Sequence, residues 1–231
     1  MRTVVVDCRF ELGKPERGRE LYLEGHVPGA AFLDLDTDLS DLSVLNAGRH
    51  PLPSTERFAA AAGRAGIGPD ALVIAYGNGA PRLWWLLRHF GHDPVGVIDA
   101  WHGPRRSGKE EIEPAVFEPR ERSGDTISAE ELHARLGDPR LAVLDARAPE
   151  RWRGEIEPID PVAGRIPGAL NAPPDAPLPD VAGNEVVVYC GSGVVACATL
   201  LKLHEAGHDD AKLYPGSWSD WSTRGLPVER G

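Results

Sequence analysis

The chain has 231 residues, which at about 100–200 residues per domain allows one large domain or two compact ones. Its formal net charge of −10 argues against nucleic acid or an anionic membrane surface as the main partner, because both require a basic footprint. No apolar run reaches the roughly 18 residues of a membrane span, and the first residues become polar too early for a signal peptide. These features predict a cytoplasmic enzyme or small-molecule binder.

Short runs of Val, Ile and Leu alternate along the chain with amphipathic segments. In chain order, we predict a strand at Thr3–Val6, a helix at Ser54–Ala65, a strand at Leu72–Ala75, a helix at Ser128–Leu136, strands at Leu141–Leu144 and Val186–Tyr189, and a helix at Val194–Ala206. Ser128 followed by Glu131 is typical of a capped helix start. Strands that alternate with helices predict an α/β fold, with a small parallel sheet flanked by helices.

Four segments of the first half recur in the same order in the second half. Val4–Arg9 resembles Ala142–Arg147, His26–Ala30 resembles Arg165–Ala169, Val73–Gly77 resembles Val186–Cys190, and Gly91–Asp93 recurs as Gly207–Asp209. Four ordered matches predict a duplicated domain. The polar, turn-forming stretch between the halves predicts a linker at 106–125, which leaves an N-terminal domain at 1–105 and a C-terminal domain at 126–231.

Cys190 lies where a predicted strand gives way to a predicted helix. In an open parallel sheet, ligands bind beyond the carboxyl ends of the strands. Gly191 and Gly193 allow the backbone to curl so that several N–H groups face one centre, and the helix N-terminus adds positive potential there. Such a loop favours the thiolate, the reactive form of cysteine, and would stabilise a charged persulfide. The alternative is that Cys190 is a small buried hydrophobic residue.

The other two cysteines, Cys8 and Cys197, are predicted to be packing residues inside a strand end and a helix. The chain has only three cysteines, and a small, odd number does not fit a disulfide scaffold. The sequence has neither a Cys-x-x-Cys motif nor a His/Cys cluster, so we expect no metal and no cofactor.

The chain resembles the tandem-domain rhodanese-type sulfurtransferases over nearly its whole length. The resemblance rests on Asp7–Arg9, Gly25–Ala30, His50–Ser54, Asp145–Arg147, Gly154–Pro158, Ile166–Ala169, Cys190–Val194 and Tyr214–Trp221. It implies two rhodanese-like domains, of which the second carries the active cysteine. Gly77 stands at the position of Cys190 in the repeat, so the first domain is expected to be catalytically inactive.

By this resemblance, Cys190 takes a sulfur atom from thiosulfate or 3-mercaptopyruvate and holds it as a persulfide. Cyanide, a small thiol or a thioredoxin-like reductant would then remove the sulfur. Amides that stabilise the charged sulfur would come from the loop residues Gly191, Gly193, Val194, Val195 and Ala196.

The loop sequence Cys190–Gly193 is similar to that of mercaptopyruvate sulfurtransferases, whereas thiosulfate-type members often carry basic residues directly after the cysteine. The resemblance implies that Ser192 works with a histidine and an aspartate from the first domain, which His50 and Asp36 match here. The alternatives are a simple turn residue for Ser192 and a surface loop residue for His50.

Arg151 matches a substrate-binding arginine of the family, and its guanidinium suits a carboxylate or a pair of thiosulfate oxygens. A solvated arginine is the alternative. Mercaptopyruvate enzymes carry a second arginine downstream, where this chain has Asp160, and a single arginine would hold a keto-acid donor less firmly. Arg147 suits a structural ion pair as well as a site, and Trp218 suits either a cleft wall or the core.

Two competing functions differ from sulfur transfer. A cysteine-dependent phosphatase or arsenate reductase needs an arginine six positions after the cysteine, and Ala196 stands there. A catalytically silent rhodanese-type binding module typically lacks the cysteine, which this chain retains at position 190.

Overall fold

The computed structural model describes residues 2–231, and their contacts divide the chain into two units. The first unit holds the chain up to Asp41 together with Leu52–Arg122, and the second holds Leu42–Pro51 together with Ser123–Gly231. Residues 106–122 therefore pack with the first unit, and a ten-residue excursion of the first half packs with the second. The domain limits at 105 and 126 stay a prediction.

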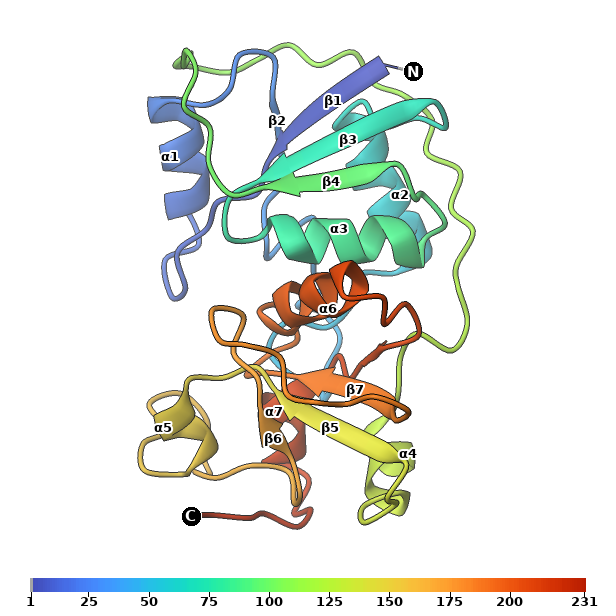
Figure 1. Cartoon of the computed structure of the whole chain (residues 1–231). Helices are drawn as coiled ribbons and strands as arrows, with labels where there is room; N and C mark the ends of the chain where they lie inside the picture. The colour runs from blue at the N-terminus through green and yellow to red at the C-terminus, as the bar shows by residue number, and fades with distance from the viewer. Residues whose placement is uncertain (1) are drawn as a thin grey trace. The chain divides into compact units, whose positions relative to one another are not determined.

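The first unit is built on a four-stranded parallel sheet (Figure 1). Its strands are β1 (Arg2–Asp7), β2 (Ala31–Phe32), β3 (Ala71–Tyr76) and β4 (Val95–Ile98), in the order β2-β1-β3-β4. Its helices are α1 (Arg17–Glu24), α2 (Thr55–Arg64) and α3 (Ala80–His89), and α3 packs against β3 and β4.

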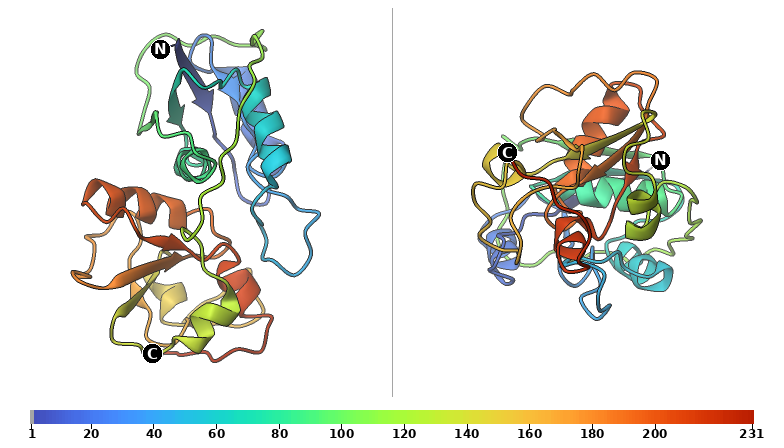
Figure 2. Two further views of the ribbon diagram at one scale, coloured as in Figure 1. Left: turned by 90° about the vertical axis from the view of Figure 1, so that its right-hand side faces the viewer. Right: turned by 90° about the horizontal axis from the view of Figure 1, so that it is seen from below.

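The second unit repeats this plan with the strand order β6-β5-β7-β8, again all parallel. Its strands are β5 (Leu141–Asp145), β6 (Leu170–Asn171), β7 (Glu185–Tyr189) and β8 (Lys212–Leu213). Its helices are α4 (Ala129–Ala134), α5 (Pro149–Trp152), α6 (Ala196–Glu205) and α7 (Ser217–Trp221). Helix α6 lies on one face of this sheet, and α4 and α7 lie on the other (Figures 1 and 2).

The predicted α/β class and the predicted strands and helices are confirmed. Successive side chains of these strands, Val143 and Leu144 in β5 and Val187 and Val188 in β7, are all buried, as expected for strands covered on both faces. Ser128 and Glu131 form the expected capping box at α4, although that helix ends at Ala134, two residues earlier than predicted. No helix within residues 2–231 is both long enough and apolar enough to cross a membrane.

The sequence repeat is also a repeat of side-chain contacts. In the first unit the Arg9 guanidinium donates to Asp7 and to the carbonyl of Gly25, at 2.6 and 2.8 Å. In the second, the Arg147 guanidinium donates to Asp145 and to the carbonyl of Gly164, each at 2.6 Å. In each unit, therefore, equivalent residues connect the end of the first strand to the equivalent loop that follows it.

At the opposite, amino-terminal end of β7, Glu185 makes a three-residue ion cluster. Its carboxylate accepts from Arg135 at 2.9 Å and lies 2.8 Å from the Lys212 ammonium. These two cations lower the pKa of Glu185 from 4.5 to about 2. Because its side chain is 31% exposed, we expect the cluster to contribute only ~1 kcal/mol after solvent screening.

A depressed carboxyl pKa stabilises the fold above the unfolded-state pKa and loses that contribution as the pH falls through the folded-state value. We therefore expect Glu185→Gln to lower the urea midpoint at pH 7, and the deficit to shrink between pH 4.5 and pH 2. Urea titrations of the wild-type protein and the Glu185→Gln variant across this pH range measure the difference between their midpoints. A deficit that stays constant down to pH 2 would show that charge on Glu185 does not matter.

Candidate active site

Cys190 directly follows the last residue of β7, at the carboxyl end of the second sheet. Its Sγ accepts a hydrogen bond from the Gly193 N–H over 3.2 Å, so the loop curls back on the sulfur. Gly193 has φ 78°, a left-handed conformation that a side chain would strain. Cys190 is 2% exposed, which places the thiol at the bottom of its loop.

The first residues of α7 hold this loop in place by hydrogen bonds. The Cys190 N–H donates to Ser217 Oγ over 3.1 Å, and the Trp218 N–H donates to the Cys190 carbonyl over 2.9 Å. The Ser219 N–H donates to the Gly191 carbonyl, also over 2.9 Å. This role of Ser217 and Ser219 was not predicted from the sequence. Their only signal was membership of the Tyr214–Trp221 segment that carries part of the family resemblance.

Ser192 and His50 meet in the second unit. The Nδ1 atom of His50 lies 2.8 Å from Ser192 Oγ, and both residues are buried. His50 reaches this position because residues 42–51 pack with the second unit, although they belong to the first half of the sequence. Asp36 lies in the first unit, in the loop after β2, where burial and the Asp34 carboxylate raise its pKa. Its link to His50 stays a prediction.

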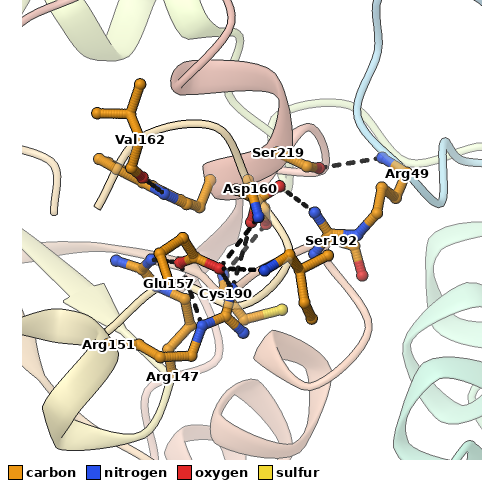
Figure 3. A network of polar contacts seen from close by, with 12 residues as sticks. Arg49, Arg147, Arg151, Glu157, Asp160, Val162, Cys190, Ser192 and Ser219 are labelled. Carbon is orange, nitrogen blue, oxygen red and sulfur yellow. Dashed lines mark hydrogen bonds and ion pairs between the residues drawn. The ribbon is translucent and has the colours of Figure 1, made fainter. Parts of the chain in front are cut away.

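Arg151 extends from α5 toward the same loop and is held by two carboxylates (Figure 3). Its guanidinium donates to Glu157 over 2.6 Å and to Asp160 over 3.3 Å. Burial alone would raise the pKa of Glu157, but the Arg151 guanidinium and the backbone N–H groups of Asp160 and Ile159 outweigh it and hold the pKa below its usual value. Glu157 therefore keeps Arg151 in place as a charged partner.

Arg147 is a structural residue rather than a part of the reacting site. Its side chain is 1% exposed, pairs with Asp145 and Glu157, and stacks under the Trp218 ring with 4.6 Å between guanidinium carbon and ring centroid. Trp218 and Trp221 are fully buried in the core of the second unit, so they do not line a cleft.

Arg49 lies at the site although the sequence did not predict it there. Its guanidinium pairs with Asp160, and its backbone N–H donates to Ser219 Oγ over 3.0 Å (Figure 3). A Cβ placed on Gly191 would lie 2.9 Å from Arg49 Nη2 and 3.5 Å from Arg151 Nη1. Two guanidiniums therefore lie over Gly191, next to Cys190. The available signal was the position of Arg49 directly before His50.

The remaining loop residues lead into α6. Val194 and Ala196 are buried, whereas Val195 is half-exposed and occupies the N-cap position of the helix without a side-chain capping hydrogen bond. Cys197, at the start of α6, is fully buried and its thiol donates to the Gly193 carbonyl over 3.3 Å. Within residues 2–231, no group of three or more His, Cys, Asp or Glu side chains is arranged to hold a metal ion.

Comparison with known proteins identifies the family. Residues 128–224 match the rhodanese-like domain family. A Pseudomonas aeruginosa protein named "Probable 3-mercaptopyruvate sulfurtransferase" is 41% identical, over 95% of this chain and 89% of its own length. A Mycobacterium tuberculosis protein named as a putative thiosulfate sulfurtransferase is 37% identical, over 98% of this chain and 90% of its own length.

The chain belongs to the rhodanese-like sulfurtransferases. The fold agrees with this family. The crystal structure of a 3-mercaptopyruvate sulfotransferase from Escherichia coli matches with a TM-score of 0.79 and 28% identity, over 94% of this chain and 93% of that one. Tandem rhodanese-like domains are thereby confirmed, and membership of an enzyme family favours catalysis over a silent binding module.

The first unit of this sulfurtransferase has Gly77 where the second has Cys190. A Cβ on Gly77 would lie 2.6 Å from Arg9 Cγ and 2.8 Å from the Arg9 backbone nitrogen, and its φ of 93° disfavours any side chain. The nearby Cys8 is no substitute, because burial raises its pKa well above the usual value. The space for a nucleophile is therefore filled by Arg9.

We expect that Gly77→Cys will not create a second sulfur-carrying loop. In a Gly77→Cys/Cys190→Ser double variant, intact-mass spectrometry after incubation with thiosulfate should find no added sulfur. The substitution at position 77 should also lower the melting temperature, because the new side chain meets Arg9. A sulfur adduct at position 77 of the double variant would contradict this packing argument.

Proposed function

We propose that this sulfurtransferase takes a sulfur atom from 3-mercaptopyruvate or thiosulfate, holds it on Cys190 as a persulfide, and passes it to a thiol or to cyanide. The observation that carries the proposal is the Cys190 thiol, held at a strand end with the Gly193 N–H donating to its sulfur. The names of the related proteins, which include both donors, support these two substrate classes.

The first half-reaction forms a sulfur–sulfur bond at Cys190. With thiosulfate, the thiolate attacks the outer sulfur, the S–S bond of the donor breaks, and sulfite leaves with the bonding electron pair. With 3-mercaptopyruvate, the carbon–sulfur bond breaks and the electron pair passes to carbon as the enolate of pyruvate, which must gain a proton. In the second half-reaction, cyanide or a thiolate attacks the outer sulfur and regenerates the Cys190 thiolate.

The Ser192–His50 pair suits the proton requirement of the mercaptopyruvate reaction. The serine hydroxyl lies two residues from Cys190 and is hydrogen-bonded to the His50 ring over 2.8 Å, so it can donate a proton to the enolate carbon. The proton that the donor's thiol group loses as the persulfide anion forms can return to the serine through the imidazole, so that no net proton is consumed. The thiosulfate reaction has no such requirement for a proton, because sulfite leaves as a stable anion. Asp36 is proposed to orient His50, in line with the family resemblance.

Arg151 is proposed to hold the anionic end of the donor by charge-assisted hydrogen bonds. Arg151→Ala should raise the KM for the preferred donor. The physiological acceptor is proposed to be a small thiol or a thioredoxin-like reductant in the cytoplasm, since the persulfide needs a thiophilic partner.

Parallel measurement of thiocyanate formation from 3-mercaptopyruvate and from thiosulfate, with cyanide as acceptor, tests the function. We expect Ser192→Ala to reduce kcat with 3-mercaptopyruvate by about tenfold to a hundredfold, since positioned acid catalysis contributes on this order, and to change kcat with thiosulfate far less. Ser222→Ala, a buried serine after α7, is the matched control. Absence of turnover with both donors in the wild-type protein would refute the proposed function.

A further inference from the structure

The carboxylate of Asp160 connects two arginines from different segments of the second unit. Its Oδ1 pairs with Arg49 Nη1, and its Oδ2 accepts from Arg151 Nη2 over 3.3 Å. The Asp160 side chain is 3% exposed, so this bridge is shielded from solvent. Burial raises the pKa of Asp160, while Arg49 and Arg151 act in the opposite direction by favouring its charged form. Asp160 therefore bridges the two guanidiniums and holds them close together.

The two guanidinium nitrogens nearest the cysteine loop do not pair with Asp160, whereas Arg151 Nη2, which does, lies slightly farther away, at 3.7 Å from the position of a Gly191 Cβ. Arg49 Nη2 and Arg151 Nη1 are the closest atoms to the position of a Gly191 Cβ, at 2.9 and 3.5 Å. Neither nitrogen has a hydrogen-bond partner among residues 2–231, and the buried Arg49 Nε also has none. Of these three nitrogens only Arg49 Nε is fully buried, and leaving such an N–H without a partner is costly. The Nη2 atom of Arg49 and the Nη1 atom of Arg151 have no protein acceptor in the described part of the chain and can therefore donate to an anion that binds over Gly191.

The sequence predicts that a single arginine, Arg151, binds the sulfur donor, because Asp160 stands where the family carries a second arginine. The structure corrects the count of guanidiniums at the loop, since Arg49 brings the second from residues 42–51. The two cations come from different segments of the chain and converge on Gly191, an arrangement that suits a planar carboxylate or a sulfonate-like group with several oxygens.

We propose that Arg49 and Arg151 together form the subsite for the anionic group of the sulfur donor, with Asp160 as the residue that positions them. This inference rests on sulfur transfer at Cys190. It assigns donor binding to Arg49, and it makes Asp160 a positioning residue that keeps the unused N–H groups turned toward Gly191.

Alkylation of Cys190 tests the subsite without relying on sulfur transfer. Iodoacetate carries a carboxylate, and iodoacetamide is its neutral counterpart of nearly the same size. In the wild-type protein, the ratio of the iodoacetate to the iodoacetamide rate should exceed the ratio for free cysteine. Arg49→Gln should lower this ratio by about tenfold, through the iodoacetate rate, because one charge-assisted contact is lost.

Two further variants control the experiment. Arg140→Gln removes a charge from the same unit at the far, amino-terminal end of β5 and should leave the ratio unchanged. Arg49→Lys keeps the charge without the planar fork and should give an intermediate ratio, which also decides the matter if the glutamine variant does not fold. The iodoacetamide rate reports the integrity of the loop in every variant.

The proposal is overturned if the Arg49 variants leave the ratio at the wild-type value, if both alkylation rates fall in parallel, or if iodoacetate fails to label Cys190. A normal donor KM in Arg49→Gln would likewise overturn it while sulfur transfer stands. Conversely, an Arg49-dependent ratio in a protein that accepts no sulfur from either donor would refute the proposed function and leave the anion subsite intact.

Discussion

Cys190→Ser is expected to abolish sulfur uptake and to reduce donor turnover by roughly a thousandfold or more, as loss of a covalent nucleophile does in other enzymes. The serine hydroxyl is similar in size and can accept the Gly193 N–H that now meets Sγ over 3.2 Å, so the loop should keep its shape. A hydroxyl cannot form the sulfur–sulfur bond of a persulfide. The chemistry, rather than the fold, should therefore fail.

Intact-mass spectrometry measures this directly. After incubation with a sulfur donor and removal of the excess, the wild-type protein should gain the mass of one sulfur atom and lose it again on addition of cyanide. Cys8→Ser and Cys197→Ser are matched controls, because both thiols are buried, and both should still accept one sulfur atom. A Cys190→Ser protein that still gains the sulfur atom would disprove the assignment of the carrier.

Arg147→Met is expected to produce the largest loss of stability among single substitutions near the site. The side chains of Arg147, Asp145 and Glu157 are all at most 3% exposed, and the guanidinium is the shared partner of both carboxylates. Removing it leaves buried negative charge with less compensation, which typically costs about 3–5 kcal/mol. The Trp218 ring also loses the cation that lies 4.6 Å from its centroid.

Thermal unfolding followed by circular dichroism should show a fall of roughly 10 °C or more. Arg153→Met is the matched control: its ion pair with Glu155 is about half-exposed on both sides, so it should shift the melting temperature little. If Arg147→Met and Arg153→Met melted at nearly the same temperature, the buried ion pair would not be a determinant of stability.

The stability of this network matters for activity because Glu157 links Arg147 to Arg151. One carboxylate oxygen of Glu157 accepts from Arg147 over 3.2 Å, and the other accepts from Arg151 over 2.6 Å. A fixed, buried cation at the end of β5 therefore helps to orient the half-buried cation proposed to meet the donor. Preorganised charges of this kind stabilise a reacting anion without reorganisation during the reaction.

Local sequence patterns were enough to predict the duplicated α/β plan and the position of the cysteine loop. Both follow from local patterns: apolar runs such as Val186–Tyr189 form buried parallel strands, and a cysteine followed by Gly191 and Gly193 forms a tight turn before a helix. The capping box at Ser128 was equally local and equally predictable. Interactions over three or four residues, or along one strand, are encoded in the order of residues alone.

The distant side chains that accompany Cys190 are brought there by long-range packing of the chain. His50 meets Ser192 across 142 residues of chain, and Arg49 pairs with Asp160 across 111, because residues 42–51 pack with the second unit. No periodicity marks such an excursion, since it depends on the contacts of a loop with another part of the fold. The same reason explains why the sequence predicted one arginine for the donor, whereas the folded chain places two guanidiniums over Gly191.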